Sequence, residues 1–477
     1  MAKTRSIKNK SILQINPHLH PQFLLLCSHK TSSSTCIIFI SLIIFLTSLV
    51  FFTSINLYLN THSLSIITHT SRNSPHFIAS ISSLFQYPSS DNDDEDTSNS
   101  PVNLSVASTV PLPPRFTIGN SSQFWKQPDG EGYKPCLAFG LKYRTRSVGI
   151  VNEKKRFLVV VVNGGLVQIR NQIVDAVVVA RVLEAALVLP VLKGDESEFS
   201  EIFDVEHFRK TLKADIRVVS SLPSTRLASS WQSLENQIPY NVHPFWIRAR
   251  FFKKLNEQGS LVLTGLDSKL SNNLSPDLQK LKCKVAFHAL KFAKPVRELG
   301  DRIARRMWIE GPYVAIHLNL EKDLWVNTNC PNSNTNCPLN VSEAARLLKE
   351  SGAPANARVY VAGGEPFGDE GAILPLKKQF VNVVTKHMLA RDVELSPYRN
   401  RTAILTAIDY IVSLSSDVFL PTYNGHLARA LQGHRAYVGH RKYVSRSMSF
   451  KGQPQARGKR RDRDVTVFPV PECMCKH

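Results

Sequence analysis

A glycine pair after an apolar run is the first place in this chain where residue types and spacing suggest chemistry. Asn163-Gly164-Gly165 follows a run that starts at Phe157 and precedes a segment with helical spacing. Glycine lets the backbone approach a ligand closely, and the N–H groups that open a helix favour anions such as phosphates. We therefore expect a phosphorylated ligand near 163–170. The alternative is an ordinary βαβ unit in which the glycines only make the turn, and the absence of G-x-G-x-x-G disfavours a Rossmann dehydrogenase.

Three basic residues in the C-terminal part of the chain could neutralise such a ligand. Arg429, His434 and Arg435 come shortly after 417–425, an apolar run that ends in a Tyr-Asn-Gly turn. If Arg429 points into a cleft, its guanidinium can pair with a phosphate, whereas a surface arginine would have no such role. No Asp-x-Asp follows an apolar strand, so we predict that no metal ion neutralises the ligand.

The elements that position these residues alternate between strands and helices. Beyond the first strand–turn–helix–strand unit, the pattern predicts strands at 313–318, 358–362 and 418–420, and helices at 403–414 and 427–432. Such alternation indicates parallel sheets covered by helices.

The part of the chain that follows Tyr133 is too long for one hydrophobic core. We therefore predict an α/β fold with two Rossmann-like domains, 133–300 and 301–477, that face each other across a cleft. Ligands of such proteins bind in the cleft, at the carboxyl ends of the strands.

An uncharged segment near the N-terminus predicts a membrane span. Residues 31–71 contain no Lys, Arg, Asp or Glu, and 36–59 is apolar for long enough to cross the hydrocarbon layer as a helix. Basic residues precede this signal anchor, so 1–35 is predicted to be cytoplasmic and the rest lumenal. Residues 60–132 are rich in Ser, Asn, Pro and Asp, which indicates a stem.

Sequons and cysteines agree with a lumenal location. Five asparagines begin N-x-Ser/Thr sequons and are predicted glycosylation sites: Asn103, Asn120, Asn273, Asn340 and Asn400. Six cysteines follow the span and are predicted to form disulfides: Cys136, Cys283, Cys330, Cys337, Cys473 and Cys475. The last two lack the spacing of a metal site, and we expect them to anchor the C-terminus to the second domain.

The formal net charge of +21 and the pI of about 9.7 suit an anionic partner. Nucleic acid is not expected in a secretory compartment, which leaves nucleotide diphosphates, acidic polysaccharide and membrane headgroups. The alternative is a solvated basic surface that only aids solubility. The basic segment 451–464 has the same two interpretations, a solvated loop or a contact with an acidic acceptor.

A membrane-tethered, lumenal, two-domain protein with a phosphate-binding turn has the profile of a nucleotide-sugar transferase. Its motifs resemble those of the plant O-fucosyltransferase family, which is related to the GDP-fucose protein O-fucosyltransferases. The similarity extends from about Arg156 to Cys475 in the family's order. The motifs are 163–170, 317–323 with Trp325, 359–365, 407–417 through 432–435, and the ending 467–475, which fits one branch of the family.

The resemblance implies a type II Golgi membrane protein with a GT-B fold, which transfers fucose from GDP-fucose with inversion and without a metal. The acceptor hydroxyl would belong to a protein or a cell-wall glycan, and some members are thought to transfer other sugars, such as rhamnose. By the same resemblance, the 163–165 turn lies against the donor, His317 and Asp323 belong to a His-x-Arg strand-end motif, and Asp417 belongs to a donor-side segment. The motif carboxylates that could act as a base are Asp323 and Glu365.

Three departures from the family pattern favour weak activity. Asn319 stands where the family has the Arg that is expected to contact the donor diphosphate, and Val167 stands where Asn is usual. The chain is also several residues shorter between Leu192 and Gly194. The rival hypothesis is a transferase-derived protein that binds a sugar nucleotide or glycan without turnover, and a purely adhesive protein disagrees with the glycine turns. His317 could also be a core histidine.

Overall fold

The computed structural model describes residues 123–193, 197–223, 238–318, 338–363, 369–439, 442–444 and 463–476. The chain divides into two compact units, Met1–Pro101 and Val102–His477, and every described residue belongs to the second. The predicted membrane span at 36–59 lies outside the described residues. Within the described ranges, no helix is both long and apolar enough to cross a membrane.

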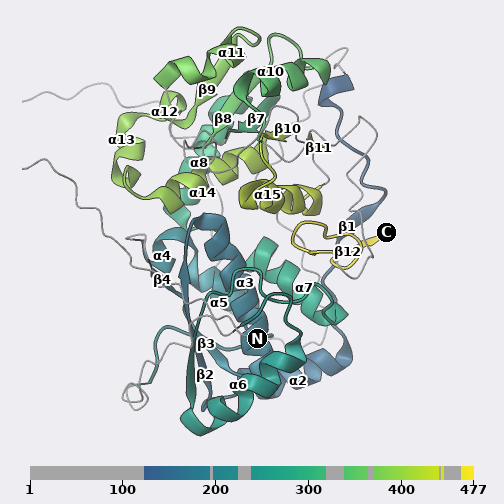
Figure 1. Cartoon of the computed structure of the whole chain (residues 1–477), viewed down its shortest axis with the longest axis vertical. Coiled ribbons are helices and arrows are strands. Elements are labelled where there is room, and N and C mark those ends of the chain that lie inside the picture. Colours follow the sequence, from purple (N-terminus) through teal and green to yellow (C-terminus); the bar gives the residue numbers. More distant parts are fainter. Residues whose placement is uncertain are drawn as a thin grey trace, which may run out of the picture. The chain divides into compact units, whose positions relative to one another are not determined.

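Five strands form a first sheet in which every pairing is parallel (Figure 1). The central strand β2 pairs with β3, β4 and β6, and β3 pairs with β5. An apolar run such as that of β2 is typical of a parallel strand covered on both faces, and β2 is buried along most of its length. The strands are β2 Phe157–Asn163, β3 Ala186–Val188, β4 Val191–Lys193, β5 Val218–Val219 and β6 Ser260–Thr264.

Helix α3 is the most buried helix that packs on this sheet. It is buried on nearly all sides and contacts β2, α6 and α7. It also contacts α14 (Thr402–Ser415) and α15 (His426–Tyr437), which pack on the second sheet. The helical segments around the first sheet are α2 Leu141–Val151, α3 Leu166–Leu183, α4 Phe199–Ile202, α5 Val205–Leu212, α6 Pro244–Gln258, α7 Pro276–Lys284 and the π-helix η3 Val285–Ala289.

A second five-stranded sheet is also parallel throughout, in the order β11-β10-β7-β8-β9. Its strands are β7 Tyr313–His317, β8 Arg358–Ala362, β9 Asn382–Thr385, β10 Val418–Pro421 and β11 Lys442–Tyr443. The predicted strands at 313–318, 358–362 and 418–420 are confirmed to within a residue, and so are the starts of the predicted helices at 403–414 and 427–432.

Long helices cover the second sheet, and one glycine lets two of them cross closely. A Cβ atom on Gly300 of α8 would lie 2.7 Å from Ile411 of α14, so this contact requires glycine. The helical segments are α8 Lys294–Trp308, α10 Val341–Glu350, α11 Leu374–Lys377, α12 Lys386–Leu389, α13 Asp392–Leu395, α14 Thr402–Ser415, α15 His426–Tyr437 and the short 3-10 turns η1 Gln123–Trp125, η4 Asp369–Ile373 and η5 Ser396–Tyr398.

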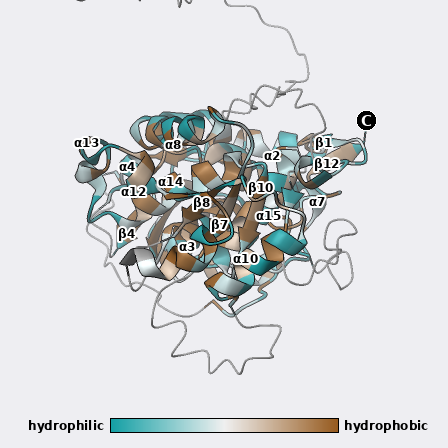
Figure 2. Cartoon of the chain, turned by 90° about the horizontal axis from the view of Figure 1, so that it is seen from above, coloured by the Kyte–Doolittle hydropathy of each residue, from teal (hydrophilic) through white to brown (hydrophobic). Residues whose placement is uncertain are grey.

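We call residues 133–293 the first lobe and 294–444 the second lobe. Helix α8 runs through the predicted domain boundary at 300. The largest hydrophobic cluster continues from α3 of the first lobe to α8 and α14 of the second, and a separate cluster lies on the other face of the second sheet. Figure 2 shows apolar residues gathered on strands and inward helix faces, with polar residues on the outer helices.

The C-terminal segment, residues 463–476, returns to the first lobe. Its strand β12 (Met474–Lys476) pairs antiparallel with β1 (Tyr133–Pro135), and Figure 1 shows the two side by side. Disulfides join Cys136 to Cys475 and Cys283 to Cys473, which confirms the predicted bonding for these four cysteines. The expected anchor to the second domain is wrong, because the β1–β12 pairing brings both tail cysteines to the first lobe. Cys330 and Cys337 lie outside the described residues.

Candidate functional site

The glycine turn after β2 has the predicted strand–turn–helix geometry. Gly164 has a φ of +90°, and a Cβ atom there would meet the Gln168 side chain at 2.4 Å. Gly165 caps α3, and its N–H donates to Oε1 of Gln168 at 2.9 Å. The carbonyl of Asn163 accepts a hydrogen bond of 2.7 Å from Gln172. The turn therefore requires glycine at 164, while two glutamines of α3 already satisfy part of its backbone.

Arg170, at the end of the same motif, ties α3 to the η3 segment of its own lobe, and its contact with the Tyr410 ring reaches the second lobe. Its guanidinium donates to the carbonyls of Ala286 (2.7 Å) and Leu290 (3.2 Å) and lies over the Tyr410 ring of α14. The residue is almost fully buried. Buried arginine donors need partners, and here backbone carbonyls supply them.

His317 ends β7 at the carboxyl edge of the second sheet, opposite Ala362 of β8 and Pro421 of β10. Burial lowers the pKa of its imidazole to about 4, so the ring is neutral near pH 7. Its Nδ1 is buried and has no hydrogen-bond partner among the described residues. A buried nitrogen of this kind is available to a ligand at this edge.

A buried ionic network holds the next turn along the same edge. Asp409 of α14 accepts hydrogen bonds from the Tyr360 hydroxyl (2.6 Å), from Nζ of Lys386 (2.8 Å) and from the N–H of Gly363 (3.1 Å). Gly363 has a φ of +130°, and a Cβ atom there would lie 2.5 Å from the carbonyl oxygen of Leu318. The network therefore fixes the close approach of the β7 and β8 ends.

Asp417 lies at the other edge of this sheet. Its carboxylate accepts a hydrogen bond of 3.0 Å from the N–H of Tyr313, the first residue of β7. Since parallel strands point the same way, the structure does not bring Asp417 together with His317 at the carboxyl edge. Asn319, Asp323 and Glu365 lie outside the described residues.

The three basic residues of α15 have different environments. Arg435 is fully buried and donates to backbone carbonyls of Ser413 (2.7 Å) and Lys442 (2.9 Å), which ties α14 to β11. His434 pairs through Nδ1 with the hydroxyl of Tyr410 at 3.0 Å. Of the three, only Arg429 lines the pocket described next.

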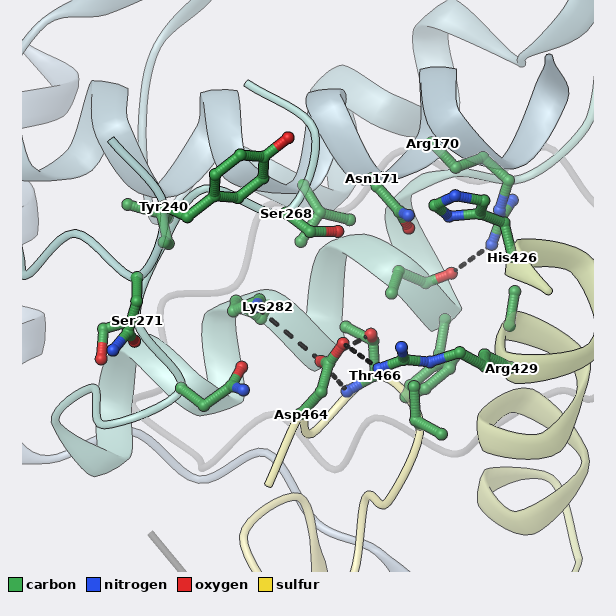
Figure 3. Close-up of a pocket in the computed structure, with 18 of the residues that line it drawn as sticks. Arg170, Asn171, Tyr240, Ser268, Ser271, Lys282, His426, Arg429, Asp464 and Thr466 are labelled. Atoms are coloured by element: carbon green, nitrogen blue, oxygen red, sulfur yellow. Dashed lines mark hydrogen bonds and ion pairs between the residues drawn. The ribbon is translucent and has the colours of Figure 1, made fainter. Parts of the chain in front are cut away.

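A pocket of about 670 Å³ lies where the first lobe, the second lobe and the C-terminal segment meet (Figure 3). The first lobe contributes residues of α3, α7, η3 and the loops around 240 and 270, and the second lobe contributes α14 and α15. The polar residues that line it are Arg170, Asn171, Tyr240, Asn241, Ser268, Ser271, Asn272, Asn273, Lys282, Tyr410, His426, Arg429, Asp464 and Thr466.

One side of the pocket is charged. Nζ of Lys282, from the first lobe, lies 3.8 Å from Oδ1 of Asp464, and Nη2 of Arg429, from the second lobe, lies 3.9 Å from Oδ2 (Figure 3). Burial alone would raise the pKa of Asp464, but Lys282, the bonds from Thr466 and Arg429 together hold it below its ordinary value. The carboxylate is therefore ionised, between one cation from each lobe.

Uncharged polar side chains line much of the rest of the pocket, beside the buried guanidinium of Arg170. Asn171 donates a hydrogen bond of 3.2 Å to Asp267, and Tyr240 is 74% exposed with Nζ of Lys269 3.4 Å from its ring centre. Amides and an exposed aromatic ring can hydrogen-bond to and stack on a polar organic ligand. The arrangement as a whole can therefore hold an anion and an uncharged polar group side by side.

Sequence reasoning missed several of these residues. Asn171 directly follows the 163–170 motif, and extending the motif by one residue would have included it. Lys282 carries no sequence signal. Asp464 ends the basic segment 451–464, and contacts between distant parts of the chain, the disulfides among them, bring it to the pocket. The described part of the chain contains no group of three or more His, Cys, Asp and Glu side chains that could hold a metal ion.

Comparisons with known proteins identify the family. The family model described as GDP-fucose protein O-fucosyltransferase matches residues 157–438, more than half of the 477-residue chain. The chain is 54% identical to O-fucosyltransferase 37 of Arabidopsis thaliana over 444 residues, covering 78% of this chain and 79% of that protein. It is 42% identical to O-fucosyltransferase 20 of Brassica napus over 423 residues, covering 75% and 76%.

The solved structures are less similar to this chain than these relatives are. POFUT1 in complex with GDP is 14% identical with a TM-score of 0.41, covering 62% of this chain and 99% of that chain. NodZ from Bradyrhizobium is 11% identical with a TM-score of 0.36, covering 60% and 93%. The assignment therefore rests on the sequence matches, which agree with the predicted plant family and with GDP-fucose as its donor. By those matches, the chain belongs to the GDP-fucose protein O-fucosyltransferase family.

Proposed function

We propose that this protein transfers fucose from GDP-fucose to a hydroxyl of a protein or cell-wall glycan, without a metal and with inversion at C1. The family's description names this donor. The observation that carries the proposal is the pocket between the lobes, where Lys282 and Arg429 bring one cation from each lobe beside uncharged hydrogen-bonding side chains such as Asn171. Such a pocket suits a substrate with an anionic half and a sugar half.

The charged side of the pocket matches what the departing nucleotide needs. As the bond from C1 to the diphosphate breaks, GDP gains negative charge, which fixed cations and helix N-termini stabilise. Arg429 lies on the first turn of α15, where His426 is the first residue, so the helix dipole adds to the positive potential. Attack by an acceptor hydroxyl from the opposite side of C1 gives the inverted product.

In this proposal, the other contacts with the donor are made at the carboxyl edges of the two sheets. The turn at 163–165 and His317 occupy such edges, where ligands of parallel sheets bind. Asn319 follows His317 along the chain and is proposed to contact the donor together with it. Asp323 and Glu365 are the motif carboxylates to be tested as the base. Asp417 is not among the proposed donor contacts, because it lies at the amino ends of β7 and β10.

Two other functions remain as rivals. The first is binding of a sugar nucleotide or glycan without turnover, which Asn319 favours because an amide replaces the family's guanidinium. The second is transfer of another sugar, such as rhamnose, since family membership fixes the reaction type better than the sugar.

A nucleotide-sugar panel with the purified full-length protein tests these possibilities. We expect GDP-fucose to raise the melting temperature more than UDP-sugars do, and GDP to be released in the presence of an acceptor. Stabilisation by GDP-fucose without GDP release would support the binding protein. Stabilisation by a different nucleotide sugar would replace fucose as the donor.

We propose further that the protein is a single-pass type II protein of the Golgi membrane, with the span at 36–59 and residues from 60 onwards lumenal. The uncharged run and its basic flank support this, and so do the disulfides, which persist in oxidising compartments. Three sequon asparagines fall in described parts of the chain and are exposed: Asn273, Asn340 and Asn400. Because Asn273 also lines the pocket, where a glycan would obstruct the substrate, Asn340 and Asn400 are the proposed glycosylation sites of these three.

Protease treatment of sealed microsomes tests the topology. A C-terminal tag should be protected until detergent is added, and an N-terminal tag should be digested. Glycosidase treatment of the same sample should reduce the apparent mass. Digestion of the C-terminal tag without detergent would contradict the proposed orientation.

A further inference from the structure

We propose that Asp464 is the general base of the transfer reaction, which removes the proton of the acceptor hydroxyl. This inference rests on the proposed function and adds a catalytic residue that none of the family motifs contains. Displacement at C1 by a hydroxyl needs a group that accepts the proton while the new bond forms. Among the described residues that line the pocket, Asp464 is the only carboxylate.

The two oxygens of Asp464 have different environments. Oδ1 accepts hydrogen bonds from the N–H (3.0 Å) and the hydroxyl (2.8 Å) of Thr466, which fix the orientation of the carboxylate. Oδ2 has one charged neighbour, Arg429, at 3.9 Å, which is longer than a hydrogen bond. Oδ2 is therefore the oxygen that can accept a hydrogen bond from an incoming hydroxyl.

The C-terminal segment holds this carboxylate in place relative to both lobes. The disulfide between Cys473 and Cys283 joins the segment to α7 of the first lobe. On the other side the segment packs on α15 so closely that a Cβ atom on Gly433 would lie 1.8 Å from the carbonyl oxygen of Thr466. A base must be held within hydrogen-bonding reach of the proton that it removes, and these two contacts restrain the segment that carries it.

The charges around Asp464 keep it ionised and make its basicity depend on the substrate. Lys282 of α7 and Arg429 of α15 face it, and Asp175 of α3 interacts electrostatically with both Lys282 and Asp464. Arg170 of α3 and His426 of α15 line the same pocket. In the free protein the two cations stabilise the carboxylate. A bound diphosphate would share these cations and add negative charge, which raises the pKa of Asp464 towards the working pH. The base would thus gain strength when the donor is bound.

The step balances without any further reactant. The O–H bond of the acceptor breaks and its proton passes to Oδ2 of Asp464, while an oxygen lone pair forms the new bond to C1 of fucose. The bond between C1 and the phosphate oxygen breaks, and its electron pair leaves with GDP. Neither oxidation nor reduction occurs.

The variant Asp464→Asn tests the role, because it keeps the size of the side chain and an oxygen for Thr466 but removes the proton acceptor. We expect kcat of the full-length protein to fall by about 10²–10⁴-fold, with KM for GDP-fucose within a few-fold of the wild type. Azide is a nucleophile that carries no proton to remove. We therefore expect added azide to restore GDP release and to give fucosyl azide of inverted configuration.

Two matched variants, Asp323→Asn and Glu365→Gln, are measured beside it. If azide rescues one of these and not Asp464→Asn, that residue is the base and the inference is overturned. Unchanged kcat in Asp464→Asn, or loss of both GDP binding and azide rescue, overturns it as well and leaves the proposed transfer intact. Absence of GDP release by the wild type, measured with enzyme in excess over donor, overturns the proposed function together with this role.

Discussion

The ammonium of Lys386 lies 2.8 Å from the carboxylate of Asp409, and only 5% and 3% of the two side chains is exposed. The pair lies beside the end of β8, where Nζ of Lys386 also donates to the carbonyl of Gly363 at 2.7 Å. The Tyr360 hydroxyl and the Gly363 N–H donate two further hydrogen bonds to the carboxylate. A buried ion pair with this many partners is compensated, whereas either charge alone would not be.

The first prediction follows from this pair. We expect Asp409→Asn and Lys386→Met each to lower the free energy of unfolding by about 3–5 kcal/mol, because each leaves one buried charge without its partner. Urea denaturation measures the loss. The control is Glu257→Gln, which breaks the exposed pair of Lys253 and Glu257 (4.0 Å) and should change stability by less than about 1 kcal/mol. Equal effects at the two sites would contradict the stabilising role of burial and geometry.

The second prediction concerns the contact between α15 and the C-terminal segment. Gly433→Ala places a methyl group where the carbonyl of Thr466 lies, so the segment must shift. We expect a loss of about 1–3 kcal/mol and lower turnover, because Asp464 moves with the segment. Gly149→Ala is the matched control: Gly149 is also helical, has open space around its Cβ position, and should gain roughly 0.5–1 kcal/mol. A Gly433→Ala protein as stable as wild type would show that the segment packs elsewhere.

The sequence predicted the strands and turns well for a physical reason. Buried parallel strands are continuous apolar runs, so β2, β7, β8 and β10 stand out from the polar segments around them. Gly164 stands out as well, because its left-handed backbone conformation favours glycine. These signals are local, and a local pattern is visible in a single sequence.

The site could be predicted only in part, because its charges depend on distant contacts. Arg435 resembles a phosphate ligand in the sequence, yet carbonyls of α14 and β11 surround it. Asp464 lies in a basic segment that carries no signal of a pocket. Its place is set by the disulfide between Cys283 and Cys473, which are 190 residues apart, and connectivity of that kind cannot be deduced from spacing.

The third prediction is a pH dependence that comes from His317. Burial lowers its pKa from 6.5 to about 4, with Asp409 and Lys386 as its charged neighbours. A lowered pKa means that the unfolded chain binds the proton more tightly than the folded protein does. The contribution of the neutral His317 side chain to the free energy of unfolding is therefore fully present above pH 6.5 and is lost as the pH falls towards 4. Between pH 6.5 and 5 the loss is roughly 2 kcal/mol.

Urea denaturation at pH 5 and pH 7.5 measures this contribution. We expect His317→Gln to be destabilised less than the wild type by the change to pH 5. His288 of the first lobe, whose pKa burial also lowers to about 4, should contribute in the same way, so His288→Gln checks that the effect follows burial of the imidazole. NMR titration of the labelled imidazoles checks the assignment directly, and a His317 signal that titrates near 6.5 would contradict it.

The last prediction concerns Asn319, which stands where the resembled family has an arginine. A guanidinium offers a diphosphate a planar, permanently charged fork, whereas Asn offers one neutral amide on a shorter stem. Hydrogen bonds to charged groups contribute about 1.5–3 kcal/mol each, so Asn319→Arg should raise GDP-fucose affinity or turnover by about 10–100-fold. Asn319→Lys, which adds the charge without the fork, should gain less. Steady-state kinetics and GDP titration separate the two effects. If the wild type already matches its arginine-bearing relatives and Asn319→Arg brings no gain, then Lys282 and Arg429 supply the charge that the diphosphate needs, and position 319 has no part in donor binding.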